Sequence, residues 1–215
     1  MKKEKIISRL KKAVLIAIVR ADDSAALPEA IDALVAGGIG AVELTLTTPN
    51  APALLRAESA KRGNSLLLGM GSILHEEDAL HAIDSGAHFI VTPVFRPTVI
   101  AACARKGIPI ASGAFTPTEA VQAWEAGADF VKLFPAENLG ASYVKSIRGP
   151  LPQLQIIPTG GVNLKTIPEF LAAGCPALGI GSNLVSAEIL KKKDWAALKA
   201  AAAAHVAAVT AARAR

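Results

Sequence analysis

The chain contains 215 residues, of which 52% are hydrophobic and 19% are charged. This length and apolar content suit one sizeable core and are too small for two ordinary domains, so we expect residues 1–215 to form a single domain. The formal charge of +5 falls on lysines in segments that resemble solvated helix faces or ends, without interleaved aromatic residues. That pattern argues against a nucleic-acid partner.

Two isolated cysteines, Cys103 and Cys175, lack the spacing of metal ligands. We expect buried free thiols and no metal site. The sequence does not open with a secretory signal pattern, and no apolar run reaches the roughly 20 residues that a membrane-spanning helix needs. A cytoplasmic protein with no membrane partner is therefore expected.

The predicted elements alternate between strands and helices along the chain. A short, basic, amphipathic helix at 2–12 precedes a first strand at 14–19. One of Asp22, Asp23 and Ser24 is expected to cap the next helix, which ends at Gly37–Gly38. Further short apolar runs, each followed by a turn and a helical pattern, predict strands at 41–46, 65–70, 88–92, 108–111, 129–134, 155–158 and 177–180.

A recurring glycine turn joins alternate helices to the next strand, at Gly38, Gly86, Gly127 and Gly174. These glycines fit left-handed helix caps. About eight strand–helix units predict an α/β fold, a single closed (β/α)8 TIM barrel with an extra N-terminal helix, and an open doubly wound sheet is the alternative. The alanine-rich segment 194–212 predicts the last helix.

Lys132 lies inside an otherwise apolar strand, within Asp-Phe-Val-Lys-Leu-Phe-Pro-Ala-Glu at 129–137. A strand that is buried on both faces has no room for a free ammonium group. Lys132 must therefore be paired, directed into a wet cavity or kept neutral. A neutral lysine amine is a nucleophile.

Glu43 and Thr45 share one face of the second predicted strand, and Lys132 shares a face of the sixth with Phe134. Even-numbered strands of an eight-stranded barrel contribute to the same interior layers, so Glu43 and Lys132 are expected to converge. A buried structural ion pair of Glu43 with Lys132 or Arg20 is the alternative.

Glycine-rich turns follow the last two predicted strands. They read Ile-Pro-Thr-Gly-Gly-Val at 157–162 and Gly-Ile-Gly-Ser-Asn-Leu at 179–184, and the second opens a short helix. Barrel enzymes commonly bind phosphate in these loops through backbone N–H groups, although each motif alone also fits a plain turn. The candidate phosphate-binding residues are Thr159, Gly160, Gly161, Gly181 and Ser182.

Arg20 and Ser72 follow the first and third predicted strands at the same rim. Arg20 could bind a carboxylate or phosphate through two hydrogen bonds, or form a salt bridge with Glu43 or Asp22. Ser72 could donate a hydrogen bond to a carboxylate, or cap a helix that begins near Glu76.

These motifs together resemble a known family. They are Val-Glu-Leu-Thr-Leu at 42–46, Gly-Met-Gly-Ser at 69–72, Thr-Pro-Thr-Glu at 116–119, Val-Lys-Leu-Phe-Pro-Ala-Glu at 131–137, Pro-Thr-Gly-Gly-Val at 158–162 and Gly-Ile-Gly-Ser at 179–182. The resemblance is to the class I aldolases that act on 2-keto-3-deoxy-6-phosphogluconate (KDPG). Relatives of these enzymes act on 2-keto-3-deoxy-6-phosphogalactonate or 4-hydroxy-2-oxoglutarate. The resemblance extends from Ala13 to Val185.

The resemblance implies a homotrimeric barrel lyase of the Entner–Doudoroff pathway that uses no metal or other cofactor. Lys132 matches the Schiff-base lysine of the family and Glu43 its general acid/base. Many members carry arginine at the position of Thr47, where it binds the pyruvate carboxylate, and others rely on the arginine that Arg20 matches. Further matches to substrate-binding positions are Ser72, Pro93, Thr159, Gly160, Gly161, Gly181 and Ser182.

The predicted reaction begins when Lys132 attacks the C2 carbonyl of a phosphorylated 2-keto acid and forms an imine. Glu43 then removes the C4 hydroxyl proton, and pyruvate and glyceraldehyde 3-phosphate are released. Two alternatives are a sugar-phosphate-binding barrel without catalytic activity and an isomerase or synthase that needs no imine. Pyruvate release from candidate substrates distinguishes the aldolase from both.

Overall fold

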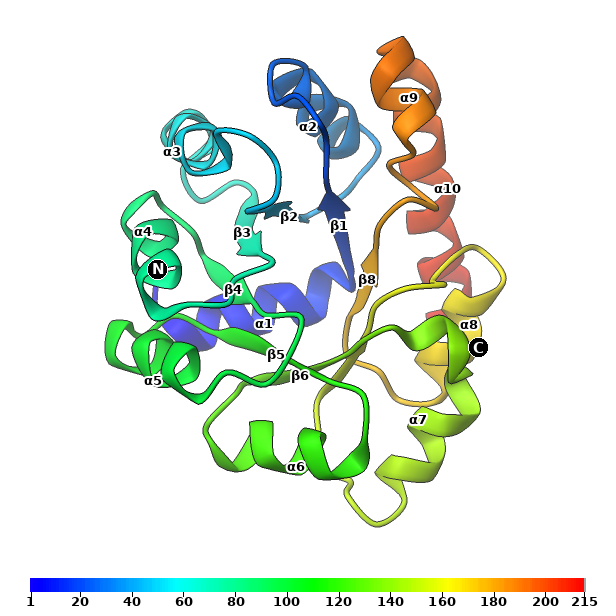
Figure 1. Cartoon of the computed structure of the whole chain (residues 1–215). Coiled ribbons are helices and arrows are strands. Elements are labelled where there is room, and N and C mark those ends of the chain that lie inside the picture. Colours follow the sequence, from blue (N-terminus) through cyan, green and yellow to red (C-terminus); the bar gives the residue numbers. More distant parts are fainter. Residues whose placement is uncertain (215) are drawn as a thin grey trace.

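Parallel strands hydrogen-bonded in the order β7-β6-β5-β4-β3-β2-β1-β8 form the wall of a barrel (Figure 1). The structure is a computed structural model that describes residues 1–214. A parallel bridge between Thr159 and Gly179 joins the two ends of this order and closes the barrel. The strands are β1 (Leu15–Val19), β2 (Ala41–Thr45), β3 (Leu67–Gly71), β4 (Phe89–Val91), β5 (Ile110–Ala114), β6 (Phe130–Leu133), β7 (Ile156–Pro158) and β8 (Leu178–Ile180).

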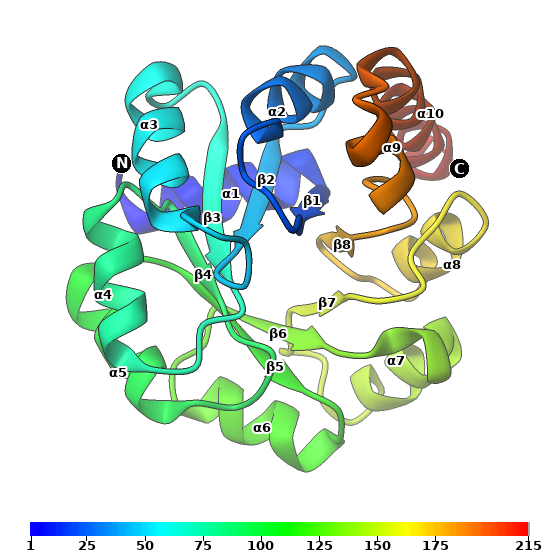
Figure 2. The ribbon, with the colours of Figure 1, turned by 45° about the horizontal axis from the view of Figure 1, so that its top comes forward.

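Helices follow the strands and surround the barrel (Figures 1 and 2). The predicted (β/α)8 barrel with an extra N-terminal helix is confirmed, and the closing bridge excludes the open doubly wound sheet. The helices are α1 (Lys3–Ala13), α2 (Leu27–Ala36), α3 (Ala51–Arg62), α4 (Glu76–Asp84), α5 (Pro97–Lys106), α6 (Pro117–Glu125), the 3₁₀ turn η1 (Ala136–Asn138), α7 (Gly140–Arg148), α8 (Thr166–Ala172), α9 (Ala187–Lys192) and α10 (Trp195–Arg213).

Alternating strand residues divide the core into two layers. Val42, Leu44, Val131 and Leu133 belong to the large cluster between the strands and the outer helices. Phe130 belongs to a separate cluster with other strand residues of the opposite parity. This alternation confirms the predicted strand faces and leaves the polar side chains of β2 and β6 directed into the barrel.

The N-terminal helix α1 lies across the end of the barrel at which the strands begin (Figure 1). Ile6 and Leu10 are each 1% exposed and pack into the interior cluster that contains Phe130. The ammonium of Lys3 lies 2.9 Å from a carboxylate oxygen of Asp129, which anchors the helix to the start of β6. The basic, amphipathic segment at the start of the chain therefore folds into a helix that closes this end of the barrel and forms its floor.

The four glycine turns predicted from the sequence have left-handed backbone conformations, with φ between 84° at Gly174 and 97° at Gly127. They follow α2, α4, α6 and α8, so the prediction of left-handed caps after alternate helices is confirmed. In each turn the N–H of the next residue donates to a carbonyl in the last helical turn, as in the pairs Ile39–Leu34, Ala87–Ala82, Ala128–Ala123 and Cys175–Phe170. The repeated turn directs each chain segment into its strand.

Two predicted boundaries are wrong. Helix α2 has Ala26 at its N-cap position without a side-chain cap, and Asp23 instead accepts a hydrogen bond from the N–H of Ala25 at 3.0 Å within the preceding loop. Strand β5 continues beyond 111 to Ala114, because a side chain at Gly113 would collide with the backbone of Pro93 and glycine lets the two segments approach. Both departures lie near the C-terminal rim of the barrel.

Helix α10 departs from the expectation that no apolar run reaches membrane-spanning length. The helix has 19 residues, and an 18-residue window within it has a mean hydropathy of 1.3, which meets the length and composition of a membrane span. The high value reflects alanine-rich composition, and the helix packs against α2 and α8 with Leu198, Ala202 and Val209 buried. In this fold α10 is the outer helix that completes the last strand–helix unit.

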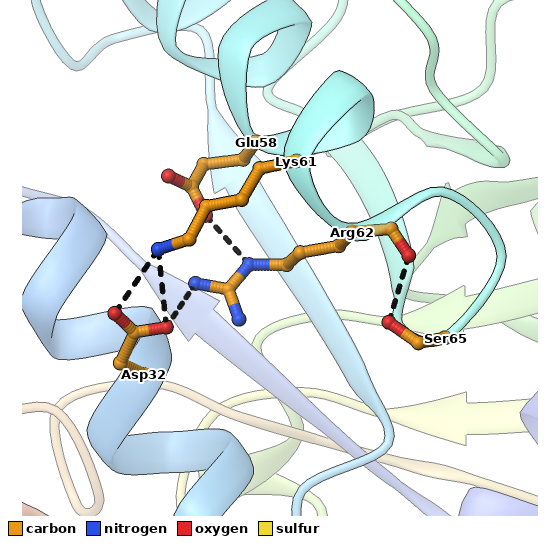
Figure 3. A network of polar contacts seen from close by, with 5 residues as sticks. All are labelled: Asp32, Glu58, Lys61, Arg62 and Ser65. Atoms are coloured by element: carbon orange, nitrogen blue, oxygen red, sulfur yellow. Dashed lines mark hydrogen bonds and ion pairs between the residues drawn. The ribbon is translucent and has the colours of Figure 1, made fainter.

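A charged network joins α2 to α3 on the outside of the barrel (Figure 3). Arg62 donates to Glu58 at 2.6 Å and to Asp32 at 2.5 Å, and Lys61 contacts Asp32 at 3.2 Å. Burial raises the pKa of Asp32, but hydrogen bonds from Arg62 and Lys61 outweigh it and bring that pKa below its usual value. The network links two neighbouring helices that approach each other outside the strands.

Candidate active site

A cavity of about 860 Å³ opens at the end of the barrel where the strands finish. This is the end at which barrel enzymes carry their active sites. All the predicted site residues except Thr47 line it. They are Arg20, Glu43, Thr45, Ser72, Pro93, Lys132, Phe134, Thr159, Gly160, Gly161, Gly181 and Ser182.

Lys132 and Glu43 face each other in the depth of this cavity. The Nζ atom of Lys132 lies 3.9 Å from Oε1 of Glu43, and the two side chains are 8% and 4% exposed. That separation forms an ion pair but exceeds hydrogen-bonding distance. The arrangement leaves the amine and the carboxylate able to engage a third group, unlike a tightly bonded structural pair.

The backbone of β3 lies directly behind the Glu43 carboxyl group. A side chain at Gly71 would collide with that carboxyl group, so glycine gives it the space to turn into the cavity. Burial raises the pKa of Glu43 above its ordinary value, and the positive charges of Lys132 and Arg20 oppose this shift without cancelling it. A carboxyl group with a raised pKa can exchange a proton nearer to neutral pH than an ordinary glutamate.

Aromatic and backbone groups surround the Lys132 amine. The ring centre of Phe134 lies 5.2 Å from Nζ. Gly113 is the register partner of Lys132 on β5, and its N–H donates to the hydroxyl of Thr92 at 3.2 Å. This small neighbour lets the backbone of Pro93 approach β5 closely, and Pro93 forms part of the cavity wall.

Thr47 is the predicted site residue that lies outside the cavity. The N–H of Thr48 donates to the carbonyl of Thr45 at 3.0 Å, and this tight turn after β2 exposes the Thr47 side chain. The hydroxyl of Thr47 donates to that of Thr45 at 3.1 Å. Contrary to expectation, Thr47 is therefore not among the residues that line the cavity, but its hydroxyl can orient that of Thr45, which is.

Arg20 and Ser72 lie at the rim in positions that favour ligand contact over the structural alternatives. Within residues 1–214, Arg20 forms no ion pair with Glu43 or Asp22. Helix α4 has His75 at its N-cap position, so Ser72 does not cap it. Ser72 adopts a left-handed conformation with φ of 62° and lines the cavity.

The two glycine loops form the cavity wall next to β7 and β8. Gly160 and Gly161 have φ values of 92° and 71°. The carbonyl of Gly161 accepts hydrogen bonds from the side chains of Asn163 at 2.9 Å and Thr166 at 3.1 Å, which fix the loop from behind. The other loop continues through Gly181 into a turn, and the predicted short helix begins later, at Ala187.

The model of the family described as "Aldolase: KDPG and KHG aldolase" matches residues 6–201. The chain belongs to the KDPG and KHG aldolase family. It is 31% identical over 193 residues to the 2-dehydro-3-deoxy-phosphogluconate aldolase of Haemophilus influenzae, covering 89% of this chain and 91% of that protein. It is 32% identical to the 2-dehydro-3-deoxy-6-phosphogalactonate aldolase of Escherichia coli, covering 82% of this chain and 86% of that protein.

Solved structures in this KDPG and KHG aldolase family share the fold. The structure titled "Native KDPGal structure" superposes with a TM-score of 0.85 at 31% identity, covering 94% of this chain and 96% of that one. A KDPG aldolase from Legionella pneumophila, with pyruvate captured as a covalent carbinolamine intermediate, superposes with a TM-score of 0.83 at 25% identity, covering 95% and 98% of the two chains. The barrel and its strand order are therefore those of the aldolase family.

The cavity of this aldolase-family chain also contains charged residues that sequence reasoning missed. Asp22 and Asp23 come from the loop after β1, Glu137 from the turn after β6, and Lys191 and Lys193 from α9 and its end. Position directly after a strand could have identified the acidic residues. The two lysines gave no such signal, because the placement of α9 depends on tertiary packing.

Metal ligation is not suggested by the side chains of residues 1–214. They contain no group of three or more His, Cys, Asp or Glu side chains that could bind a metal ion. Cys103 and Cys175 are buried free thiols, and burial raises the pKa of each to about 12. Neither thiol lines the cavity, and thiols in this state are poor nucleophiles, so neither is a candidate nucleophile of the site.

Proposed function

We propose that this protein is a class I aldolase that cleaves KDPG into pyruvate and glyceraldehyde 3-phosphate. The observation that carries the proposal is the Lys132–Glu43 pair, with 3.9 Å between Nζ and Oε1, buried in a cavity whose rim contains two glycine loops. Membership of the KDPG and KHG aldolase family supports it. An amine nucleophile, a proton-transferring carboxyl group and an anion-binding rim are the three parts that this reaction needs.

Lys132 is the proposed nucleophile. Its neutral amine attacks the C2 carbonyl of the keto acid, forms a carbinolamine and, with loss of water, gives a protonated imine. The imine withdraws electrons from the C3–C4 bond. The buried position next to the Phe134 ring suits this step, because an aromatic face can accommodate the positive charge of the protonated imine.

Glu43 is the proposed proton carrier. It removes the C4 hydroxyl proton, through a water where the distance requires one, as the C3–C4 bond breaks and its electrons pass into the imine to give an enamine. The same carboxyl group then returns a proton to C3 after the aldehyde leaves. Water hydrolyses the resulting imine and releases pyruvate, and Lys132 regains its amine.

The rim residues are the proposed anion ligands. Arg20 and Ser72 bind the keto-acid carboxylate, with Thr45 beside them. The glycine loops at 159–161 and 181–182 bind the phosphate through backbone N–H groups and hydroxyls. Many family members bind the carboxylate with an arginine at the position of Thr47, and in this chain Arg20 is proposed to do so instead. The position of Arg20 on the cavity lining supports this role.

The test of this function is to trap the imine. Incubation with pyruvate and borohydride is expected to give a reduced adduct on Lys132, detected by mass spectrometry of the digested protein. Lys132→Ala is expected to give none and to lose aldolase activity. No adduct on the wild-type protein at saturating pyruvate would falsify the Schiff-base role.

The C4 configuration of the substrate is a separate question. Aldolases for the phosphogluconate and the phosphogalactonate are similar to this chain to nearly the same extent, at 31% and 32% identity. We propose the gluconate-derived substrate, with the galactonate epimer and 4-hydroxy-2-oxoglutarate as alternatives. The comparison of kcat/KM for the two C4 epimers under identical conditions decides between them.

We also propose a cytoplasmic homotrimer that acts in the Entner–Doudoroff pathway. Support for an assembly comes from large apolar side chains on three consecutive loops. Leu74 after β3, Val94 after β4 and Phe115 after β5 are 40%, 50% and 40% exposed. The loops after β3 and β4 are joined by a hydrogen bond of 2.7 Å from Arg96 to the carbonyl of Leu74. A group of exposed apolar residues on adjoining loops suits a subunit contact.

A further inference from the structure

Helix α9 brings two lysines to the wall of the catalytic cavity. Lys191 and Lys193 line this cavity, whereas Lys192 between them does not. The Lys192 ammonium instead lies 2.7 Å from Glu188 on the preceding turn of the helix. Three consecutive lysines therefore divide into two that border the cavity and one that is paired away from it.

The end of α9 explains how lysines two positions apart share one cavity. Residues i and i+2 of a regular α-helix do not lie on the same face. Lys193 is the C-cap residue of α9 and has left-handed backbone angles, φ 52° and ψ 39°. The chain thus leaves its helical path at Lys193, and this side chain returns to the face on which Lys191 and Leu190 border the cavity.

Helix α9, which brings these lysines to the cavity, follows one of the two candidate phosphate loops in the chain. The loop of Gly181 and Ser182 comes after β8, and the hydroxyl of Ser186 accepts from the N–H of Ile189 to begin the helix. Figure 2 shows α9 above the end of β8. Lys191 and Lys193, at the C-terminal end of α9, therefore border the same cavity as the glycine loop after β8.

The charges of the two lysines are not neutralised by contact. Within residues 1–214, neither forms an ion pair. The acidic residues on the cavity lining outside the Lys132–Glu43 pair are Asp22, Asp23 and Glu137, and one oxygen of Asp23 already accepts from Ala25. Two unpaired ammonium groups on the same cavity as a loop with backbone N–H groups suit a phosphate, which carries about two negative charges at neutral pH.

We propose that Lys191 and Lys193 are substrate-positioning residues that select keto acids with a terminal phosphate. This inference rests on the proposed aldolase function and deepens it by naming residues that favour phosphorylated substrates over dicarboxylates. The lysines attract and orient the phosphate end and make no contact with the reacting carbon atoms. The two lysines therefore affect how tightly the phosphorylated substrate binds, while imine formation at Lys132 does not depend on them.

The test compares the double variant Lys191→Gln/Lys193→Gln with the wild type. Each lysine at this exposed position is expected to contribute about 3-fold and the pair about 10-fold to kcat/KM for the phosphorylated substrate, through KM with kcat unchanged. Raising the salt concentration from about 0.05 M to about 0.5 M should largely remove the difference because salt screens exposed charges. The yield of the borohydride-reduced pyruvate adduct, and kcat/KM for 4-hydroxy-2-oxoglutarate, should change less than 2-fold.

Lys192→Gln is the matched control, since it makes the same kind of substitution on the same helix outside the cavity, with one charge removed instead of two. Equal losses in Lys192→Gln and the double variant would overturn the proposal, as would an unchanged KM in the double variant. Binding of inorganic phosphate, measured by calorimetry, separates this inference from the aldolase assignment. A wild-type protein that cleaves no keto acid, yet binds phosphate about 10-fold more tightly than the double variant, would overturn the proposed function and support the lysine assignment.

Discussion

Glu43 shows at the residue scale how burial prepares a side chain for proton transfer. Its carboxyl group is 3% exposed, and burial raises its pKa while Lys132 and Arg20 limit the rise. A general base is most useful when its pKa lies near the working pH. The barrel interior therefore supplies both the position and the acidity that the proposed reaction needs from this residue.

We expect Glu43→Gln to lower kcat by about 10³-fold, because glutamine cannot transfer the proton. In the wild type, kcat should rise with pH as Glu43 loses its proton, with a midpoint above the usual glutamate value of about 4.3 because its pKa is raised. This rise of kcat with pH, the acid limb of the profile, should be absent from the residual activity of the Glu43→Gln variant. A Glu43→Gln enzyme that retains the limb and most of its rate would contradict the assignment. Measurements of kcat between about pH 4 and pH 9 provide the check.

Ser112 provides a second residue-scale prediction, on stability. Its side chain is fully buried on β5, and its hydroxyl has no hydrogen-bond partner within the described residues. Ser112→Ala is expected to raise the free energy of unfolding by about 1 kcal/mol, because it removes a buried polar group that gains nothing in the fold. Urea unfolding followed by circular dichroism measures this change.

Thr92 is the matched control for Ser112. It is also fully buried, but its hydroxyl donates to the carbonyl of Val94 at 2.7 Å and accepts from the N–H of Gly113 at 3.2 Å. Thr92→Val should destabilise the protein by about 1–3 kcal/mol, since it leaves those backbone groups unpaired. Destabilisation of the same size in both variants would show that the Ser112 hydroxyl has a partner.

At the scale of elements, neighbouring helices are joined by side chains that the barrel strands do not position. The network between α2 and α3 contains an inner pair, with Arg62 9% and Glu58 5% exposed, and an outer carboxylate, Asp32, that is 53% exposed. The buried pair is protected from solvent, whereas the Asp32 contacts are screened by water. Substitution in the buried Arg62–Glu58 pair and substitution of Asp32 should therefore change the free energy of unfolding by different amounts.

Asp32→Asn is expected to lower the free energy of unfolding by about 0.5 kcal/mol at neutral pH. The pKa of Asp32 is lowered in the folded state, so its contribution is present above the unfolded pKa of about 3.9 and is lost as pH falls through the folded value. Urea unfolding at pH 7 and near pH 3 should show a difference from wild type only at the higher pH. Asp84→Asn, which removes a single looser contact of 3.9 Å with Lys106, should have a smaller effect than Asp32→Asn at pH 7.

At the scale of the whole molecule, the proposed trimer depends on the exposed apolar loops. Light scattering is expected to give about three times the chain mass of 22.1 kDa for the wild type. Val94→Glu, which places a charge at the most exposed of these side chains, should shift the protein towards the monomer. Leu164→Glu is the control, because Leu164 is 47% exposed on the turn before α8 and outside those loops. A wild-type monomer, or dissociation caused equally by both variants, would contradict the subunit contact.

The fold was largely predictable because its signals are local. Apolar runs of strand length mark each strand, and glycines such as Gly86 and Gly127 mark the ends of alternate helices, without reference to the rest of the chain. Strand parity likewise predicted that Lys132 and Glu43 would meet, since alternate residues of even strands share the interior.

Features that depend on loop paths and packing were not predictable in this way. Thr47 was expected in the cavity, but the hydrogen-bonded turn after Thr45 exposes its side chain. Lys191 and Lys193 looked like part of a solvated charge run, because only the packing of α9 brings them to the cavity. The alternation of residues along a strand does not indicate where the following loop, or a short helix near the end of the chain, packs against the barrel.

The floor formed by α1 has a consequence for the order of catalytic events. Ile6 and Leu10 fill the interior beneath Phe130, so the barrel is closed at the end where its strands begin and the cavity opens at the other end. Pyruvate remains bonded to Lys132 below the departing aldehyde in the proposed reaction. Cleavage of the C3–C4 bond frees the aldehyde phosphate on the open side while pyruvate is still bonded to Lys132, so we expect the aldehyde to be released first and pyruvate last.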